Sequence, residues 1–307
     1  MRMAISQKFP SVRKIGESIV AWFVIGFLNI SAWLPFTWLQ GLGRFFGGLM
    51  ARFNSHSRFL VRCNLRAVYP QLSDAELTVL SKAVLQHNAQ SITELGAMWL
   101  GSRQTLQGLI HNVHGEQYLQ SAFAQGKGVL LLAPHLGNWE LAGNYLAMNY
   151  PATFMYRPPN LRALAPLMRR SRERFGAQLA PTDLRGVRQV IKALKSAQVS
   201  GILPDQDAGE NGVQVPFMGV PARTMTLASK LLQKTDAHCL FIMALRNQKG
   251  GFELHILPAD RDALADKDPV RAATALNHGV AQCVQQAPEQ YLWAYRRFRG
   301  APGIYQK

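Results

Sequence analysis

The sequence predicts an α/β fold in which helices flank a mixed, largely parallel central sheet. Short apolar segments alternate with longer segments of helical periodicity, which is typical of α/β proteins. One apolar segment, residues 129–133, carries no charge and lies between Gly128 and Pro134, as expected of a strand that is buried on both faces. With 307 residues, of which 48% are apolar, the chain can bury a large core.

The individual elements follow from apolar periodicity and from helix-start signals. Ser73 and Glu76 form a capping-box sequence that starts one helix, and Asp183 is a favourable N-cap for another. The last two strands are separated only by the polar segment 247–251, so we expect them to pair as an antiparallel hairpin. In chain order we predict helices at 74–100, 116–125, 138–148, 161–175, 184–197, 224–235 and 269–286, and strands at 129–133, 152–156, 199–203, 238–245 and 252–257.

The N-terminal part of the chain contains a long segment without charge, from Ser18 to Gly43. Its length would suffice to cross a bilayer, which needs ~20 apolar residues. However, Pro35 interrupts the segment, and basic residues flank both ends, which places both ends on the cytoplasmic side. We therefore favour two helices with a break between them that dip into one leaflet; a buried core helix is the alternative. The chain then divides into a membrane-anchoring helical segment, residues 1–66, and an α/β domain, residues 67–307.

The net charge of +16 is concentrated in two segments. Residues 1–66 carry nine Lys or Arg and one acidic residue, and residues 157–195 carry ten and two, while the rest of the chain is balanced. This distribution predicts two surfaces that face anions, the first of them anionic membrane lipids. A nucleic-acid partner would also explain the charge, but it would leave the apolar segment without a role, so we expect none.

The cysteines and most histidines give no sign of a metal site. Cys63, Cys239 and Cys283 are widely separated, which disfavours disulfides and favours a reducing compartment. His111 and His114 do not have a zinc-like spacing with any cysteine, so the sequence predicts no metal site and no cofactor.

A histidine and a glutamate at the end of the buried strand are the strongest candidates for catalysis. His135 lies in the predicted strand-to-helix turn, and Glu140 lies in the first turn of the next helix. In that geometry we expect Glu140 to hydrogen-bond one ring nitrogen of His135, which leaves the other nitrogen free to take a proton from a hydroxyl. The alternative is a structural histidine in a turn, with a glutamate that the helix dipole favours at that position.

Several segments resemble a known family when they are taken together with the His-x4-Glu spacing. The sequences of these segments and their order along the chain resemble the late acyltransferases of lipid A synthesis, which add a secondary acyl chain to the Kdo-bearing lipid A precursor. The family usually has His where this chain has Tyr295. The segments that carry the resemblance are Tyr156-Arg-Pro-Pro-Asn160, Arg170-Ser-Arg172, Pro204-Asp-Gln-Asp207, Val215-Pro-Phe217 and the closing segment 288–298.

The resemblance implies an acyl transfer at the cytoplasmic face of the bacterial inner membrane. The donor would be a thioester of acyl carrier protein, and the acceptor would be a hydroxyl of a phosphorylated lipid A precursor. His135 would be the general base, oriented by Glu140. The backbone N–H groups of Leu136, Gly137 and Asn138 would stabilise the oxyanion. A glycerolipid acyltransferase or another glycolipid acyltransferase would use the same His-x4-Glu chemistry and is the alternative.

The second basic segment is then expected to hold the anionic groups of the acceptor. His135, Arg157 and Asp205 each follow a predicted strand, and sites in open α/β sheets lie at the carboxyl ends of strands. Asp205 and Asp207 would orient the binding arginines or the acceptor sugar, unless they only shape a turn. The candidate binding residues are Arg157, Asn160, Arg170, Arg172, Arg185 and Arg188.

Overall fold

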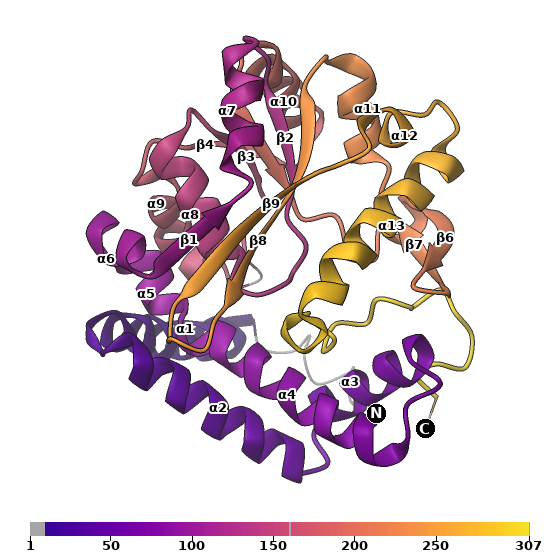
Figure 1. Cartoon of the computed structure of the whole chain (residues 1–307). Coiled ribbons are helices and arrows are strands. Elements are labelled where there is room, and N and C mark those ends of the chain that lie inside the picture. The colour runs from indigo at the N-terminus through magenta and orange to yellow at the C-terminus, as the bar shows by residue number, and fades with distance from the viewer. Residues whose placement is uncertain (1–9, 160, 307) are drawn as a thin grey trace.

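The computed structural model describes residues 10–159 and 161–306, and its centre is a five-stranded sheet of order β1-β9-β8-β2-β5 (Figure 1). Strand β2 pairs in parallel with β5 and β8, and β8 and β9 form an antiparallel hairpin. Strand β1 pairs in parallel with β9 at the edge. The strands are β1 (Ile110–His114), β2 (Val129–Leu132), β5 (Val199–Ile202), β8 (His238–Arg246) and β9 (Phe252–Pro258).

Two smaller strand pairs complete the β-structure. Strands β3 (Thr153–Tyr156) and β4 (Gln178–Pro181) are parallel, and a bridge between Ala152 and Val199 joins them to β5. Strands β6 (Val213–Phe217) and β7 (Val220–Thr224) form a separate antiparallel hairpin. The carboxyl ends of β2, β3, β4, β5 and β8 therefore point to the same edge of the sheet.

Helices cover both faces of the sheet. Helices α7 and α8 pack on one face, and α10, α11 and α13 pack on the other, so that β2 is buried at every residue. The helices are α1 (Pro10–Trp33), α2 (Phe36–Arg52), α3 (His56–Val68), α4 (Asp74–Thr93), α5 (Leu95–Leu100), α6 (Arg103–Gly108), α7 (Glu116–Ala124), α8 (Trp139–Asn149), α9 (Ala165–Glu173), α10 (Leu184–Lys195), α11 (Leu227–Lys234), α12 (Arg261–Leu264) and α13 (Pro269–Gln286).

The predicted mixed α/β fold is confirmed, including the hairpin of the last two strands and the caps at Ser73 and Asp183. The sequence analysis did not find β1, β4, β6 or β7, because these strands are short, polar or interrupted by proline, as Pro216 interrupts β6. The helix expected at 224–235 is shorter, since residue 224 still belongs to β7. The helix expected at 74–100 is divided into α4 and α5 at Glu94.

The N-terminal helices break where Pro35 predicted a break, since α1 ends at Trp33 and α2 begins at Phe36. They lie at the lower end of the molecule in Figure 1, where α2 packs closely on α4. A Cβ atom on Gly47 would lie 2.4 Å from the Cα atom of Gln86, so only glycine allows this approach. Within residues 10–159 and 161–306, no helix combines the length and the hydropathy needed to cross a bilayer.

Candidate active site

His135 and Asp205 form a hydrogen-bonded pair at the carboxyl ends of β2 and β5. The Nδ1 atom of His135 lies 2.8 Å from Oδ1 of Asp205, and the backbone N–H of His135 donates to Oδ2 at 3.0 Å. The carboxylate is almost completely buried, whereas 12% of the imidazole is exposed. Burial alone would raise the pKa of Asp205, but the charge of His135 and its hydrogen bonds outweigh burial and lower that pKa. Asp205 therefore stays ionised and fixes the orientation of the imidazole.

The other ring nitrogen of His135 faces Gln206 and Trp139. Nε2 of His135 lies 3.1 Å from Nε2 of Gln206, so the amide donates to the imidazole when Nδ1 carries the proton. The ring of Trp139 meets the imidazole edge-to-face, with 5.0 Å between the ring centroids. A second hydrogen-bonding group can therefore approach His135 at its Nε2 atom.

Glu140 does not orient His135, which corrects the sequence-based expectation. Its Oε1 atom accepts from Nη2 of Arg172 at 2.7 Å, and its Oε2 atom accepts from the indole N–H of Trp99 at 3.2 Å. The reason is the direction of α8: Asn138 caps this helix, and the first turn then directs Glu140 towards α5 and α9 rather than back to the histidine. Asp205, which we expected to orient arginines or the acceptor, takes the place beside His135.

The expected oxyanion donors are also occupied. The backbone N–H groups of Leu136, Gly137 and Asn138 donate to the carbonyl oxygens of Pro134, Gln290 and Ala244, at 2.7, 3.1 and 2.8 Å. Gly137 adopts a φ of +64°, and a Cβ atom at this position would lie 2.0 Å from the carbonyl oxygen of Ala244. These three N–H groups therefore hold the loop in place, and the hydrogen bond from Asn138 to Ala244 attaches it to β8.

A buried ion pair supports this loop from below. Glu94, at the junction of α4 and α5, accepts from Nε and Nη2 of Arg246 at 2.8 and 2.7 Å. Its Oε2 atom also accepts from the side-chain amide of Asn138 at 2.9 Å. Because the Glu94 side chain is fully buried and that of Arg246 is 3% exposed, water does not screen the pair. The network joins α4, the end of β8 and the cap of α8 into one support for the His135 loop.

An apolar cavity opens beside Trp139, between α8 and the strands. The space in which the centre of a water-sized sphere fits is about 80 Å³, and the cavity opens to solvent. Glu140 and Arg172 lie among its polar lining residues, and most of the others are apolar or small. The lining residues are Leu131, Ala133, Trp139, Glu140, Gly143, Asn144, Leu146, Ala147, Phe154, Met155, Arg172, Gly201, Ile202, Leu203 and Ile242. The cavity therefore presents apolar surface together with a few polar groups, which is typical of ligand pockets.

Of the expected binding residues, Arg172 is the one that lines this cavity. Arg157 follows β3 and Arg188 lies on α10, and both are exposed; Asn160 lies outside the described residues. Arg170 is exposed and donates to the carbonyl oxygen of Pro166 in its own helix, and Arg185 pairs with Asp183 on the surface.

Asp207 lies in a turn after β5. Its Oδ1 atom accepts from the backbone N–H of Gly209 at 3.4 Å, and its own N–H donates to the hydroxyl of Tyr295 at 3.2 Å. Its carboxylate therefore shapes the turn, and the hydroxyl of Tyr295 holds the turn against the closing segment.

That closing segment braces the His135 loop. Residues Leu136 and Tyr291 form an antiparallel bridge, and the N–H of Leu292 donates to the carbonyl oxygen of His135 at 3.0 Å. Tyr291 and Trp293 are buried with their rings edge-to-face. The part of the sequence that most specifically resembles the acyltransferases thus lies directly against the candidate catalytic histidine.

A family model for bacterial lipid A biosynthesis acyltransferases matches residues 6–300. The chain belongs to this family. It is 29% identical over 287 residues to the lipid A biosynthesis lauroyltransferase of Escherichia coli, and 27% identical to the palmitoleoyltransferase of the same organism, with 92% of each chain covered. A phosphatidylinositol mannoside acyltransferase of Mycobacterium tuberculosis is 30% identical over 140 residues, which cover 42% of this chain and 44% of that one. The protein is therefore an acyltransferase.

The sequence analysis of this acyltransferase missed four residues that shape its site: Trp99, Glu94, Gln206 and Arg246. Gln206 lies in the segment 204–207, but no pattern in that segment indicates which of the four side chains faces the histidine. Glu94 had a detectable signal, since it is an acidic residue in a largely apolar stretch and such a group is buried only with a partner. Its partner Arg246 is 152 residues away, and only the fold reveals it.

Proposed function

We propose that the protein transfers a fatty acyl chain from a thioester of acyl carrier protein to a hydroxyl of a phosphorylated lipid A precursor. The observation that carries this proposal is the His135–Asp205 pair beside an apolar cavity. The comparisons support this proposal, because relatives that match 92% of the chain are named lipid A biosynthesis acyltransferases. The acyl chain would occupy the cavity, with its thioester carbonyl near Trp139, Glu140 and Arg172.

In this mechanism His135 is the general base. The acceptor hydroxyl replaces the amide of Gln206 at Nε2 and gives its proton to that nitrogen, while its oxygen attacks the thioester carbonyl carbon. A tetrahedral intermediate forms, the carbon–sulfur bond breaks, and the departing thiolate takes the proton from the imidazolium. Asp205 keeps Nδ1 protonated and stabilises the positive charge on the ring. A positioned base of this kind contributes about 10²–10⁴-fold to the rate.

The developing oxyanion needs donors other than the three occupied backbone groups. Arg172 has five N–H donors, and one of them is used by Glu140. The N–H groups of Trp139 and Glu140 in the first turn of α8 meet no acceptor among the residues that the structure describes. We assign the oxyanion to these groups, with Glu140 holding the guanidinium at the mouth of the cavity.

The acceptor's phosphates would bind the exposed arginines at the same edge of the sheet. Arg157 follows β3, and Arg185 and Arg188 lie in the first turns of α10 after β4. Arg170 lies on the exposed side of α9. Guanidinium groups bind phosphates bidentately, and the excess positive charge of this segment would also attract an acidic donor protein.

The N-terminal segment, residues 1–66, would hold the enzyme on the cytoplasmic face of the inner membrane. One side of α1 and α2 is buried against the α/β core, while the other exposes large apolar side chains. A helix pair of this kind lies in the plane of a membrane interface, and each basic residue near anionic head groups adds about 1 kcal/mol. The exposed side chains are Val20, Trp22, Phe23, Phe27, Ile30, Trp33, Trp38, Leu42, Phe45, Phe46, Leu49 and Phe53.

The decisive experiment is an acyl-transfer assay with acyl carrier protein thioesters and a lipid A precursor in mixed micelles. We expect His135→Ala and Asp205→Ala to lower kcat/KM by at least about 10²-fold, since the first removes the base and the second removes the carboxylate that orients it and stabilises its charge. His56→Ala is the matched control, because His56 is exposed on α3. Undiminished turnover in His135→Ala would refute the mechanism. Transfer to a phosphatidylinositol mannoside but not to the lipid A precursor would support the other glycolipid acceptor.

A further inference from the structure

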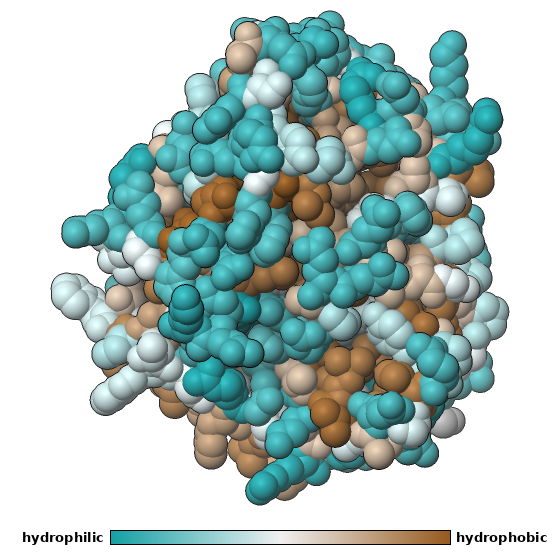
Figure 2. All heavy atoms as spheres, in the orientation of Figure 1, coloured by the Kyte–Doolittle hydropathy of each residue, from teal (hydrophilic) through white to brown (hydrophobic). Residues whose placement is uncertain are grey.

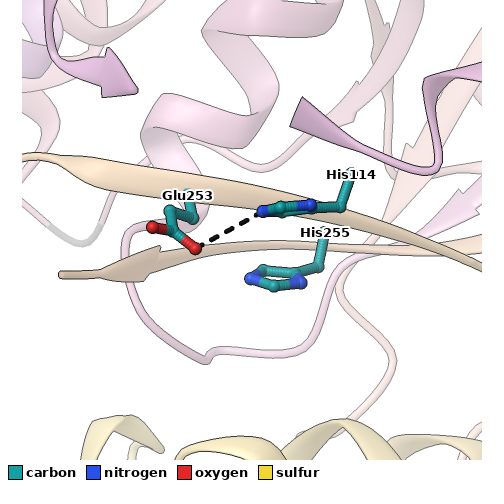
Figure 3. A group of neighbouring side chains, drawn as sticks. All are labelled: His114, Glu253 and His255. Carbon is teal, nitrogen blue, oxygen red and sulfur yellow. Dashed lines mark hydrogen bonds and ion pairs between the residues drawn. The ribbon is translucent and has the colours of Figure 1, made fainter. Parts of the chain in front are cut away.

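Three metal-ligating side chains meet on one face of the β1–β9 pair, outside the site described above. His114 of β1 stands opposite His255 of β9 in the parallel register, and Glu253 precedes His255 by two residues. Because side chains alternate along a strand, Glu253 and His255 point to the same face of the sheet. Figure 3 shows all three side chains together, with the two imidazoles stacked above one another. The candidate ligand atoms all lie within 4.8 Å of one another.

The distances fit a small tetrahedral ion. Bonds of zinc to imidazole nitrogen and carboxylate oxygen are ~2.0–2.2 Å, so two ligand atoms of a tetrahedral site lie about 3.4 Å apart. Nε2 of His114 and Oε2 of Glu253 are 3.4 Å apart. The rings of His114 and His255 are stacked with their centroids 4.8 Å apart, so His255 has to shift before its nitrogen can take the third position. Water can take the fourth position, since the His114 side chain is 52% exposed.

The charge state of the cluster also suits a cation. The Glu253 carboxylate supplies a negative charge to a divalent ion.

The location gives the site a structural role. Strand β1 lies at the edge of the sheet, has five residues, and changes register between Ile110 and Asn112. Figure 2 shows hydrophilic and apolar residues side by side over β1 and β9, while Ile110 and Val113 of β1 pack partly buried against the core. We propose that His114, Glu253 and His255 bind Zn²⁺ and so fasten the edge strand β1 to β9.

The test is zinc titration of the full chain, prepared without a polyhistidine tag and stripped with a chelator. Isothermal calorimetry should show one Zn²⁺ per chain. We expect His114→Ala and His255→Ala each to weaken binding at least tenfold, since loss of supporting partners alone costs about 10–100-fold. His278→Ala is the matched control, because His278 is exposed on α13. Zn²⁺ should also raise the melting temperature of the wild type and of the control, but not of His114→Ala with His255→Ala.

A second measurement makes the geometry itself testable. Co²⁺ in a tetrahedral site gives intense visible absorption, which His255→Ala should abolish. Mg²⁺ should not compete with Zn²⁺, because it prefers octahedral oxygen ligands. The proposal is overturned if the wild type binds no zinc, or if the double variant binds it with unchanged stoichiometry and affinity. It does not depend on the acyl-transfer mechanism, and His114→Ala should leave turnover unchanged.

Discussion

Two arginine–glutamate pairs lie near the histidine loop, and they differ in their access to water. The side chains of Arg246 and Glu94 are 3% and 0% exposed, whereas those of Arg172 and Glu140 are 28% and 14% exposed. Glu94 uses both of its oxygens for Arg246 and Asn138 and cannot reach a substrate. Arg172 faces the cavity and has donors left. The same residue types are therefore closed to solvent in one place and open to a ligand in the other.

The largest effect should come from breaking the buried pair of Arg246 and Glu94. Glu94→Ala leaves Arg246 buried without its partner, which costs about 3–5 kcal/mol of unfolding free energy. Urea unfolding followed by circular dichroism measures this loss. The control is Glu173→Ala, which removes the partner of Arg169 in a pair that is exposed to solvent and should cost no more than about 1 kcal/mol. Equal losses in the two variants would mean that burial does not distinguish the pairs.

Breaking the partly exposed pair of Arg172 and Glu140 should affect activity rather than stability. Arg172→Ala removes the proposed donor to the oxyanion, so kcat should fall by about 10²–10³-fold while the urea midpoint changes little. Arg169→Ala on the same helix is the control, because Arg169 contacts Glu173 on the surface. If Arg172→Ala loses stability and keeps its kcat, the pair at the cavity mouth is structural and the comparison fails.

Low pH should lower the stability of the region around Arg246 and Glu94, because His87 becomes protonated there. Burial, and then the charges of Arg246 and Arg44, lower the pKa of His87 to about 4. The unfolded chain takes up a proton below a pH of about 6.5, so stability is complete above that pH and falls as the pH drops towards 4. The loss is at most about 3 kcal/mol. Urea midpoints at pH 7 and pH 5 should converge in His87→Gln; an unchanged difference would exclude this residue as the cause.

The smallest effect should come from Trp99, which donates to Glu140 at 3.2 Å. Trp99→Phe removes this hydrogen bond while most of the ring volume stays, so we expect a loss of about 1 kcal/mol and a few-fold decrease in kcat/KM. Initial rates at several thioester concentrations measure the decrease in kcat/KM. A decrease as large as that of Arg172→Ala would contradict this ranking, because the indole hydrogen bond would then matter as much as the guanidinium.

The parts of the fold that could be predicted are those with a strong local pattern. The buried run of β2, the hairpin of β8 and β9, and the helix break at Pro35 all follow from residues within a few positions of one another. The polar edge strand β1 could not be found in this way, because its residues Ile-His-Asn-Val-His resemble a loop until β9 pairs with them.

The candidate site shows the same limit. His135 and Asp205 were both expected at strand ends, and the parallel order of β2 and β5 brings them together. Which carboxylate meets the imidazole could not be predicted, because it depends on the direction in which α8 leaves the loop and so turns Glu140 towards Arg172. The spacing of five residues identified the right segment but assigned the partner wrongly.

The bracing of the histidine loop by the closing segment ties its conformation to a distant part of the sequence. The carbonyl oxygen of Gln290 accepts from Gly137, and the N–H of Leu292 donates to the carbonyl oxygen of His135. Because such long-range contacts form only after the segments between them are ordered, local folding alone cannot give the loop its final shape. The loop should therefore be among the slower parts of the molecule to reach its native geometry.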